Sequence, residues 1–289
     1  MTRLLYQDDP FLLEFEAGVV ERLLHQGRPA VVLDRTAFYP EGGGQPWDTG
    51  QLDEARVEAV LSAGGRVLHV LDRPLPQDRV RGRVDGERRL DHLQQHHGQH
   101  LLSRALEERC GARTLAFHLG TEDTTIDLHR FVGPEALADG VRCANEVVWQ
   151  ARAVRVRVVA AAEAVELGCE VPEDAGDAVR LVEVDGFDLQ PCSGTHPTLT
   201  SEVGVILALG LEKHKGGGRL RFVCGQRALR AFDARQGALT RPRSKGWRKP
   251  RAGPSTSARR CASAVSSCSN GPCSRTRASS WPRPARPPR

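Results

Sequence analysis

Short runs of apolar residues, separated by turn-forming residues, fill the first 85 positions of the chain. Apolar runs stand at 31–33, 57–61 and 67–70, and a Ser-Ala-Gly-Gly turn at 62–65 separates the last two. Short strands at this spacing are typical of a small barrel. We therefore expect residues 1–85 to form a small N-terminal β-barrel.

A helical period replaces this pattern after the charged sequence at 85–89. Between residues 91 and 106, apolar side chains recur about every 3.6 positions, at Leu93, Leu101, Leu102, Ala105 and Leu106. Asp91 is the expected N-cap, and Gly111 is expected to end the helix.

Strands and helices then follow one another without a regular βαβ alternation. Strands are expected at 114–118, 124–128, 153–158, 179–184, 203–211 and 220–223, and a helix is expected to start near Pro134. This order favours an α+β fold, in which residues 86–238 form a two-layer α/β sandwich.

The charge is distributed unevenly. Residues 241–289 hold thirteen of the 41 Lys and Arg and none of the 36 Asp and Glu, so residues 1–240 carry a net charge of −8. The composition of residues 239–289 cannot form a core. That tail is either a disordered basic arm for RNA or the product of a gene read out of frame, and we favour the second. Elsewhere, contact with a polyanion would depend on local patches, each of which can equally be a solvated face. The candidates are Arg79, Arg81 and Arg83, the pair Arg88 and Arg89, and the cluster of Lys213, Lys215, Arg219 and Arg221.

No apolar run approaches the roughly 20 residues that span a bilayer, and the N-terminus turns acidic before a signal-peptide core develops. We therefore expect a cytoplasmic protein that does not act at a membrane. The eight cysteines are scattered, which in a reducing compartment indicates free thiols or metal ligands.

Four of the ten histidines lie within nine residues of the predicted helix. His96 and His100 are four residues apart, so they share a face of the helix, as two ligands of one metal ion must. Histidines at this spacing also occur on helices that bind no metal. The interpretation as a metal site depends on a second pair of soft ligands with the same spacing, Cys192 and His196.

Three histidines and one cysteine form a tetrahedral set that suits Zn²⁺. Gly194 and Pro197 would let the chain bend around the ion. Four filled positions favour a structural zinc, since a catalytic zinc usually keeps one position for water. A catalytic site would need a loose ligand, for which His196 is the candidate, or expansion to five-coordination.

Other metal motifs are excluded by their residues. His97 stands where the His-Glu-x-x-His proteases carry their general base. Cys192 lacks the second cysteine and the preceding His-x-Glu of the zinc deaminases. The loop with Gly42, Gly43 and Gly44 is not a phosphate loop because no Gly-Lys-Ser/Thr follows. It is either a flexible hairpin loop or a place where another molecule approaches the backbone.

Three separated motifs together resemble a known family. They are the sequence from Asp34 to Gln45, the His96-x-x-x-His100-Leu-Leu helix, and Cys192-Ser193-Gly194-Thr195-His196 followed by Thr200–Gly204. They are similar to the AlaX family of free-standing alanyl-tRNA editing proteins, and hence to the editing domain of alanyl-tRNA synthetase. The resemblance runs from about residue 8 to 230. Ser193 departs from the usual Gly, and His97 from the usual Thr.

The resemblance implies a zinc-dependent aminoacyl-tRNA deacylase, a carboxylic ester hydrolase that acts in translation fidelity. Its partner would be mischarged tRNA for alanine, carrying serine or glycine, and it would not require ATP. The metal ligands would be His96, His100, Cys192 and His196. The alternative is a non-catalytic tRNA-binding module with a structural zinc.

A site that accepts serine but spares the smaller alanine must hydrogen-bond the serine hydroxyl. The resemblance implies a polar selector on the strand after the metal helix, which indicates Thr114 or His118. It also implies that Gly43, Gly44 and Gln45 lie near the editing pocket. His97 is expected to face away from the metal.

Overall fold

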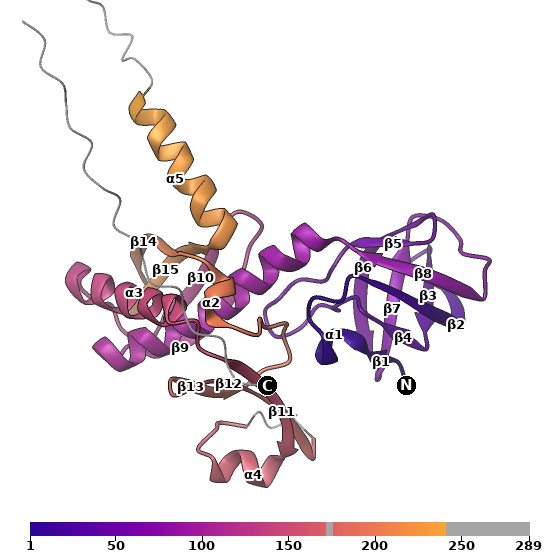
Figure 1. Ribbon diagram of the computed structural model, residues 1–289, viewed down its shortest axis with the longest axis horizontal. Helices are drawn as coiled ribbons and strands as arrows, with labels where there is room; N and C mark the ends of the chain where they lie inside the picture. The colour runs from indigo at the N-terminus through magenta and orange to yellow at the C-terminus, as the bar shows by residue number, and fades with distance from the viewer. Residues whose placement is uncertain (172–175, 241–289) are drawn as a thin grey trace, which may run out of the picture. The chain divides into compact units, whose positions relative to one another are not determined.

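The computed structural model of the protein describes residues 1–171 and 176–240. Six antiparallel strands of the N-terminal region close into a barrel in the order β2-β3-β7-β6-β5-β8 (Figure 1). These strands are β2 (Glu14–His25), β3 (Arg28–Leu33), β5 (Gly50–Leu52), β6 (Ala55–Ala63), β7 (Arg66–Leu71) and β8 (Arg79–Val84). The strand β8 pairs with both β2 and β5, which completes the ring.

The barrel interior is apolar because alternate strand residues point inward. Its core includes Phe15, Leu33, Phe38, Val60 and Leu71, all buried. A short helix, α1 (Leu5–Asp8), precedes the barrel strands. Two short strands, β1 (Arg3–Leu4) and β4 (Arg35–Thr36), form a parallel pair outside the barrel. The strands expected at 31–33, 57–61 and 67–70 are thus present, within β3, β6 and β7.

The metal-ligand helix α2 (Gly86–Cys110) is longer than the sequence pattern predicts. Its N-cap is Asp85, whose carboxylate accepts a hydrogen bond from the Arg88 amide. The prediction of Asp91 as N-cap is wrong, because the charged first turn carries no apolar period and conceals the helix start. The predicted end is confirmed, since Gly111 caps the helix at φ 60°.

Helices α2 and α3 (Pro134–Trp149) pack together against a four-stranded sheet ordered β14-β15-β10-β9. The strands are β9 (Thr114–Leu119), β10 (Thr124–Leu128), β14 (Ile206–His214) and β15 (Gly217–Cys224). The core between helices and sheet includes Leu102, Leu106, Ala144, Ile126 and Phe222. The turn between the last two strands lies at 215–216, because Gly217 and Gly218 already belong to β15.

A second, three-stranded sheet has the order β11-β12-β13 and ends at the Cys192 segment. Its strands are β11 (Val154–Ala160), β12 (Ala178–Val184) and β13 (Asp188–Pro191), and α4 (Ala161–Glu166) follows the first of them. A 3₁₀ helix, η1 (Thr200–Val203), occupies the start of the region expected to be a strand at 203–211. The strand there begins only at Ile206.

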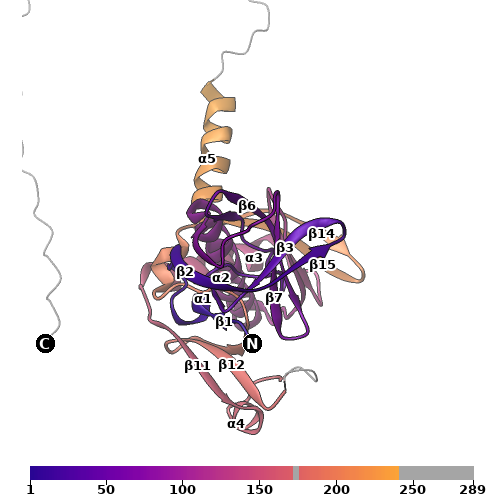
Figure 2. The same cartoon turned by 90° about the vertical axis from the view of Figure 1, so that its right-hand side faces the viewer.

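The helix α5 (Gly225–Thr240) follows β15 and was not expected from the sequence. Figure 2 shows it extending away from the sheet, and Leu229 and Phe232 on it are exposed. Nearly all of the tail predicted at 239–289 lies outside the described residues. The domain boundaries and the α+β fold class, with its two-layer sandwich, stay predictions. Among the described residues, no helix is long and apolar enough to cross a membrane.

Candidate metal centre and adjoining cavity

The four predicted metal ligands meet in one buried cluster. Their candidate ligand atoms all lie within 4.8 Å of one another. His96 and His100 come from adjacent turns of α2, and their rings stack with centroids 5.1 Å apart. Cys192 and His196 come from the segment after β13, and Cys192 Sγ lies 3.1 Å from His96 Nε2. Two segments nearly a hundred residues apart thus build one site.

Local geometry holds the Cys192 segment against the helix. A Cβ atom on Gly194 would lie 2.5 Å from His96 Cε1, so only glycine permits this approach. Arg180 on β12 donates hydrogen bonds from Nη1 to the carbonyls of Cys192, at 2.7 Å, and of Gly194, at 3.0 Å. The bend around the site therefore depends on a glycine and on an arginine that the sequence analysis did not select.

The three histidines of the cluster are in the protonation state that a metal ion requires, whereas the cysteine must lose its proton to bind one. Burial lowers the pKa of His96 and His196 well below the usual value, and that of His100 to about 4, so these imidazoles are neutral and can donate a lone pair. Burial raises the pKa of the Cys192 thiol to about 11, while the Gly194 amide and Arg180 act in the opposite direction.

Two nitrogens of the cluster, His96 Nδ1 and His196 Nε2, are buried without a hydrogen-bond partner. A buried polar atom left in this way costs free energy that a bound cation would recover. The mixed imidazole and thiolate donors and their mutual distances fit a small, borderline-soft divalent ion. The four residues could therefore hold a metal ion.

His97 also belongs to this neighbourhood. It is not one of the four cluster residues, but its side chain is fully buried, and its Nδ1 lies 2.9 Å from Nδ1 of His196. Its Nε2 has no hydrogen-bond partner. Adjacent residues on a helix point in different directions, but the 192–196 segment wraps far enough around α2 to contact both His96 and His97.

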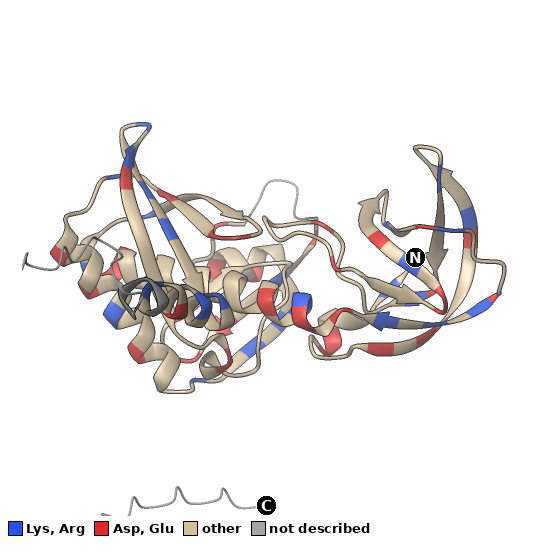
Figure 3. Ribbon diagram, turned by 90° about the horizontal axis from the view of Figure 1, so that it is seen from above, with Lys and Arg blue, Asp and Glu red and all other residues tan. Residues whose placement is uncertain are grey.

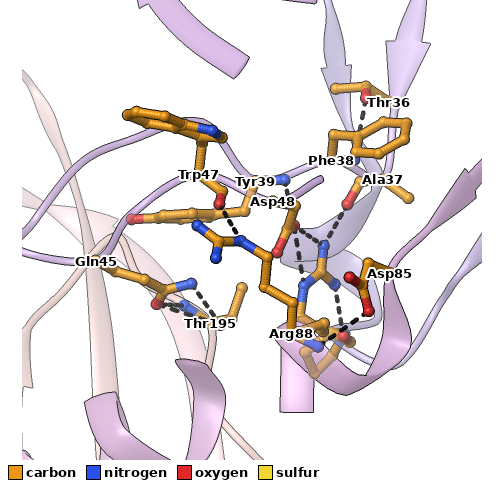
Figure 4. A network of polar contacts seen from close by, with 12 residues as sticks. Thr36, Ala37, Phe38, Tyr39, Gln45, Trp47, Asp48, Asp85, Arg88 and Thr195 are labelled. Atoms are coloured by element: carbon orange, nitrogen blue, oxygen red, sulfur yellow. Dashed lines mark hydrogen bonds and ion pairs between the residues drawn. The ribbon is translucent and has the colours of Figure 1, made fainter. Parts of the chain in front are cut away.

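The glycine-rich loop of the barrel region lies directly against the metal-ligand segment. Gln45 donates from Nε2 to Thr195 Oγ1 at 3.0 Å and accepts from the Thr195 amide at 3.2 Å (Figure 4). Gly44 has φ +77°, and a Cβ there would lie 2.6 Å from the Phe117 ring. Gly43 has φ +56°, and a Cβ there would lie 3.3 Å from Ser193 Oγ. The loop therefore needs its glycines in order to fit against the site.

A buried ion pair fixes the start of α2 in the barrel region. Arg89 donates from Nε to Asp48 Oδ2 at 3.1 Å and from Nη1 to the Pro10 carbonyl at 2.7 Å. The Tyr39 amide donates to the same Asp48 oxygen at 2.7 Å. The pair is almost completely inaccessible to solvent. It sets the direction in which the helix carries its histidines.

A cavity of about 500 Å³ adjoins the candidate metal ligands. Its lining includes Gly43, His96, Gln99, His100, Phe117, Arg180, Gln190, Cys192 and Ser193. In the part of the chain that the structure describes, neither Thr114 nor His118 is among the residues that line it. Phe117 turns toward the cavity, and the next residue on the strand, His118, is exposed to solvent.

Thr114 is connected to the cavity through two intervening side chains. Its Oγ1 lies 2.6 Å from Ser103 Oγ, which in turn accepts a hydrogen bond from Gln99 Nε2 at 2.9 Å. Gln99 lines the cavity, so this chain of hydrogen bonds relates the predicted selector to the site. Gln99 and Gln190 were missed by sequence reasoning, although the position of Gln99, directly before a ligand histidine on a helix, could have indicated it.

The basic residues singled out in the sequence are largely engaged with acids. Arg219 and Arg221 pair with Asp127 and Asp123 across the sheet. Arg81 and Arg83 on β8 face Glu16 and Glu14 on β2. Figure 3 shows positively and negatively charged positions interspersed along the ribbon. This arrangement fits a solvated charged face.

Comparison with known proteins places these features in context. The family model for class II tRNA synthetases (A) matches residues 10–88. The chain is 36% identical to the alanine–tRNA ligase of Pyrococcus furiosus over 259 residues, which cover 83% of this chain and 28% of the ligase. It is 34% identical to the alanyl-tRNA editing protein Aarsd1 of Mus musculus over 219 residues, which cover 72% of this chain and 52% of that protein.

The chain thus spans about half the length of the editing protein and about a quarter of the ligase. Both matches extend well beyond the barrel residues that the family model covers, since they include most of the chain. The resemblance inferred from the three sequence motifs is confirmed: the chain is a homologue of alanine–tRNA ligases and of alanyl-tRNA editing proteins.

Proposed function

We propose that the protein is a zinc-dependent deacylase that hydrolyses the ester of mischarged tRNA for alanine, with seryl-tRNA or glycyl-tRNA as the substrate. The observation that carries the proposal is the cluster of His96, His100, Cys192 and His196 beside a cavity of about 500 Å³, in a homologue of alanyl-tRNA editing proteins. We further propose that it acts in the cytoplasm and without ATP.

The four cluster residues would hold the zinc. When bound, zinc supplies positive charge that favours attack of water on an ester carbonyl. The cavity would enclose the aminoacyl end of the tRNA and hold it close to the cluster. An aminoacyl ester is an activated substrate, so positioning can contribute much of the rate enhancement.

Selection of serine over alanine requires a hydrogen bond to the serine hydroxyl. We propose that the polar side chains of Thr114 and His118 on β9 contribute to it. Thr114 would act through Ser103 on the amide of Gln99, which lines the cavity. His118, which is exposed, would need to contact another part of the substrate.

Gly43 and Gly44 would allow the substrate to approach the loop backbone, and Gln45 would keep that loop on the Thr195 segment. The loop would thereby form one wall of the cavity. Its position depends on contacts across the two parts of the chain, so the barrel region would contribute to substrate binding as well as to stability.

The second candidate is a non-catalytic tRNA-binding module with a structural zinc. The observation that favours it is the complete set of four ligands, because catalytic zinc sites usually contain three protein ligands. Under this alternative, the metal would only fasten α2 to the segment after β13.

A deacylation assay distinguishes the two candidates. Purified full-length protein, loaded with zinc and without ATP, is incubated with seryl-, glycyl- and alanyl-tRNA for alanine. The deacylase predicts that seryl-tRNA decays much faster than in buffer and faster than alanyl-tRNA. The matched variants are His100→Ala, which should lose this activity, and His25→Ala in the barrel hairpin, which should keep it. Stoichiometric zinc with no acceleration would refute the enzyme and favour the structural module.

A further inference from the structure

We propose that His97 is a positioning residue, which fixes the protonation pattern of His196 so that this histidine can bind the metal. The inference rests on the metal-binding part of the proposed function and not on deacylation. It starts from the contact of 2.9 Å between the Nδ1 atoms of the two buried side chains.

The contact between two Nδ1 atoms restricts the tautomers of both rings. A neutral imidazole has one N–H donor and one acceptor nitrogen, so one of the two Nδ1 atoms must carry the proton and the other must accept it. Either His196 donates to His97, or His97 donates to His196. The hydrogen bond allows both arrangements. They differ in which of the two rings carries a proton on Nε2 and which presents a lone pair there.

Metal binding selects one of these arrangements. His196 Nδ1 is occupied by His97, and His196 Nε2 is the ring nitrogen without a partner. To bind a cation, Nε2 must present a lone pair, so the proton of His196 must be on Nδ1. His97 must then accept that proton's hydrogen bond at Nδ1 and carry its own proton on Nε2. The reverse arrangement would point an N–H of His196 at the metal.

A partner for the second ring nitrogen is the usual means by which a protein orients a metal-ligating histidine. In most sites this partner is a carboxylate, a carbonyl or water. His100 has a carboxylate nearby, with Asp188 Oδ2 4.0 Å from its Nδ1. His196 has a neutral imidazole instead, which accepts a hydrogen bond without adding negative charge to the site.

The sequence context supports a specific role for His97. Its side chain is completely buried next to the candidate metal ligands. Burying a polar side chain costs free energy unless the side chain makes a hydrogen bond. Its Nε2 has no partner, so the contact with His196 is the hydrogen bond that accounts for a histidine at this place.

The test compares two substitutions of similar size. In His97→Asn, the amide oxygen can occupy the place of Nδ1 and accept from His196, whereas His97→Leu keeps the bulk and removes the acceptor. We expect the zinc dissociation constant, measured by competition with a chromophoric chelator, to rise about 10- to 100-fold in His97→Leu. The Asn variant should stay within about threefold of the wild type, since its acceptor is retained. Equal zinc affinity of His97→Leu and wild type would overturn the proposal.

A second measurement requires no variant and therefore does not depend on folding of His97→Leu. Nitrogen-15 NMR of the histidine rings in zinc-loaded wild-type protein should show the proton of His196 on Nδ1 and the proton of His97 on Nε2. A proton on Nδ1 of His97 in the loaded protein would contradict the inference. Protein with the expected tautomers and bound zinc but without deacylation would instead refute the enzyme and leave this inference intact.

Discussion

The barrel and the helix α2 both bury histidines, but the ring nitrogens of these histidines differ in their hydrogen-bond partners. His69 in the barrel is fully buried, with Nε2 2.8 Å from Thr36 Oγ1 and Nδ1 3.3 Å from the Val31 carbonyl. Both of its nitrogens therefore have partners. At the metal cluster, His96 Nδ1 and His196 Nε2 have none.

This difference distinguishes His69 from His96 and His196, whereas burial does not. Burial lowers the pKa of both kinds, so both are neutral. A buried polar atom without a partner costs about 1–3 kcal/mol, and several such atoms within one cluster are best explained by a ligand that satisfies them.

The largest effect is expected from replacing Arg89, whose ion pair with Asp48 joins α2 to the barrel region. Replacing it with Met leaves Asp48 as a buried, uncompensated charge, and this should lower the free energy of unfolding by about 3–5 kcal/mol. Urea denaturation measures the loss. The exposed pair of Arg66 and Glu21 is the control, and Arg66→Met should change stability by less than about 1 kcal/mol. Similar losses in both variants would show that the buried pair does not join the regions.

Removing a metal ligand should have the next largest effect. Structural zinc contributes about 10–16 kcal/mol through four ligands, so losing one should weaken binding by about 3 kcal/mol, or on the order of 100-fold. We expect Cys192→Ala and His100→Ala each to lower zinc content and deacylation together. Chelator competition and the seryl-tRNA assay measure the two quantities.

The matched control for the ligand variants is the barrel histidine. His69→Gln removes an equally buried imidazole, yet it should leave zinc affinity unchanged because its partners are Thr36 and Val31. Full deacylation activity in metal-free wild-type protein would show that the metal is dispensable for the reaction.

The third prediction concerns acid stability of the barrel. Burial lowers the pKa of His69 to about 4 from its ordinary value of 6.5. The unfolded chain therefore takes up the proton first, so stability is complete above pH 6.5 and is lost as the pH falls toward 4. Between pH 7 and pH 5 this amounts to about 2 kcal/mol.

The difference between wild type and His69→Gln isolates this contribution from that of the other buried histidines. Urea denaturation at pH 7, 6 and 5, with a chelator present, should give a shallower pH dependence for the variant. Parallel pH dependences of the two proteins would contradict the assignment.

Sequence patterns predicted the candidate metal cluster because each pair of its residues is local. Helical geometry brings His96 and His100 to one face, and Cys192 and His196 share one short segment. Only the C-terminal end of α2 was predictable, because Gly111 in the left-handed conformation marks it. The charged residues that follow Asp85 carry no apolar period, so the start was placed six residues too late.

Features that depend on long-range packing were not predictable. Strand alternation separates Phe117 from His118, but it does not say which of the two faces the cavity. Likewise, α5 has no clear buried stripe, and apolar residues on it such as Phe232 are exposed. The contact of His97 with His196 depends on how a distant segment wraps around the helix.

The smallest expected effect comes from another contact between the regions, Gln45 with Thr195. Gln45→Met should leave the Thr195 amide and hydroxyl without partners, at a cost of about 1–2 kcal/mol. Because all four metal ligands remain, zinc affinity should change far less than in Cys192→Ala, while deacylation should fall as the loop loses its position. A double-mutant cycle with Thr195→Val, followed by urea denaturation, measures the coupling directly. Strict additivity of the two substitutions would mean that packing of the glycine-rich loop, rather than this pair of hydrogen bonds, joins the barrel to the metal site.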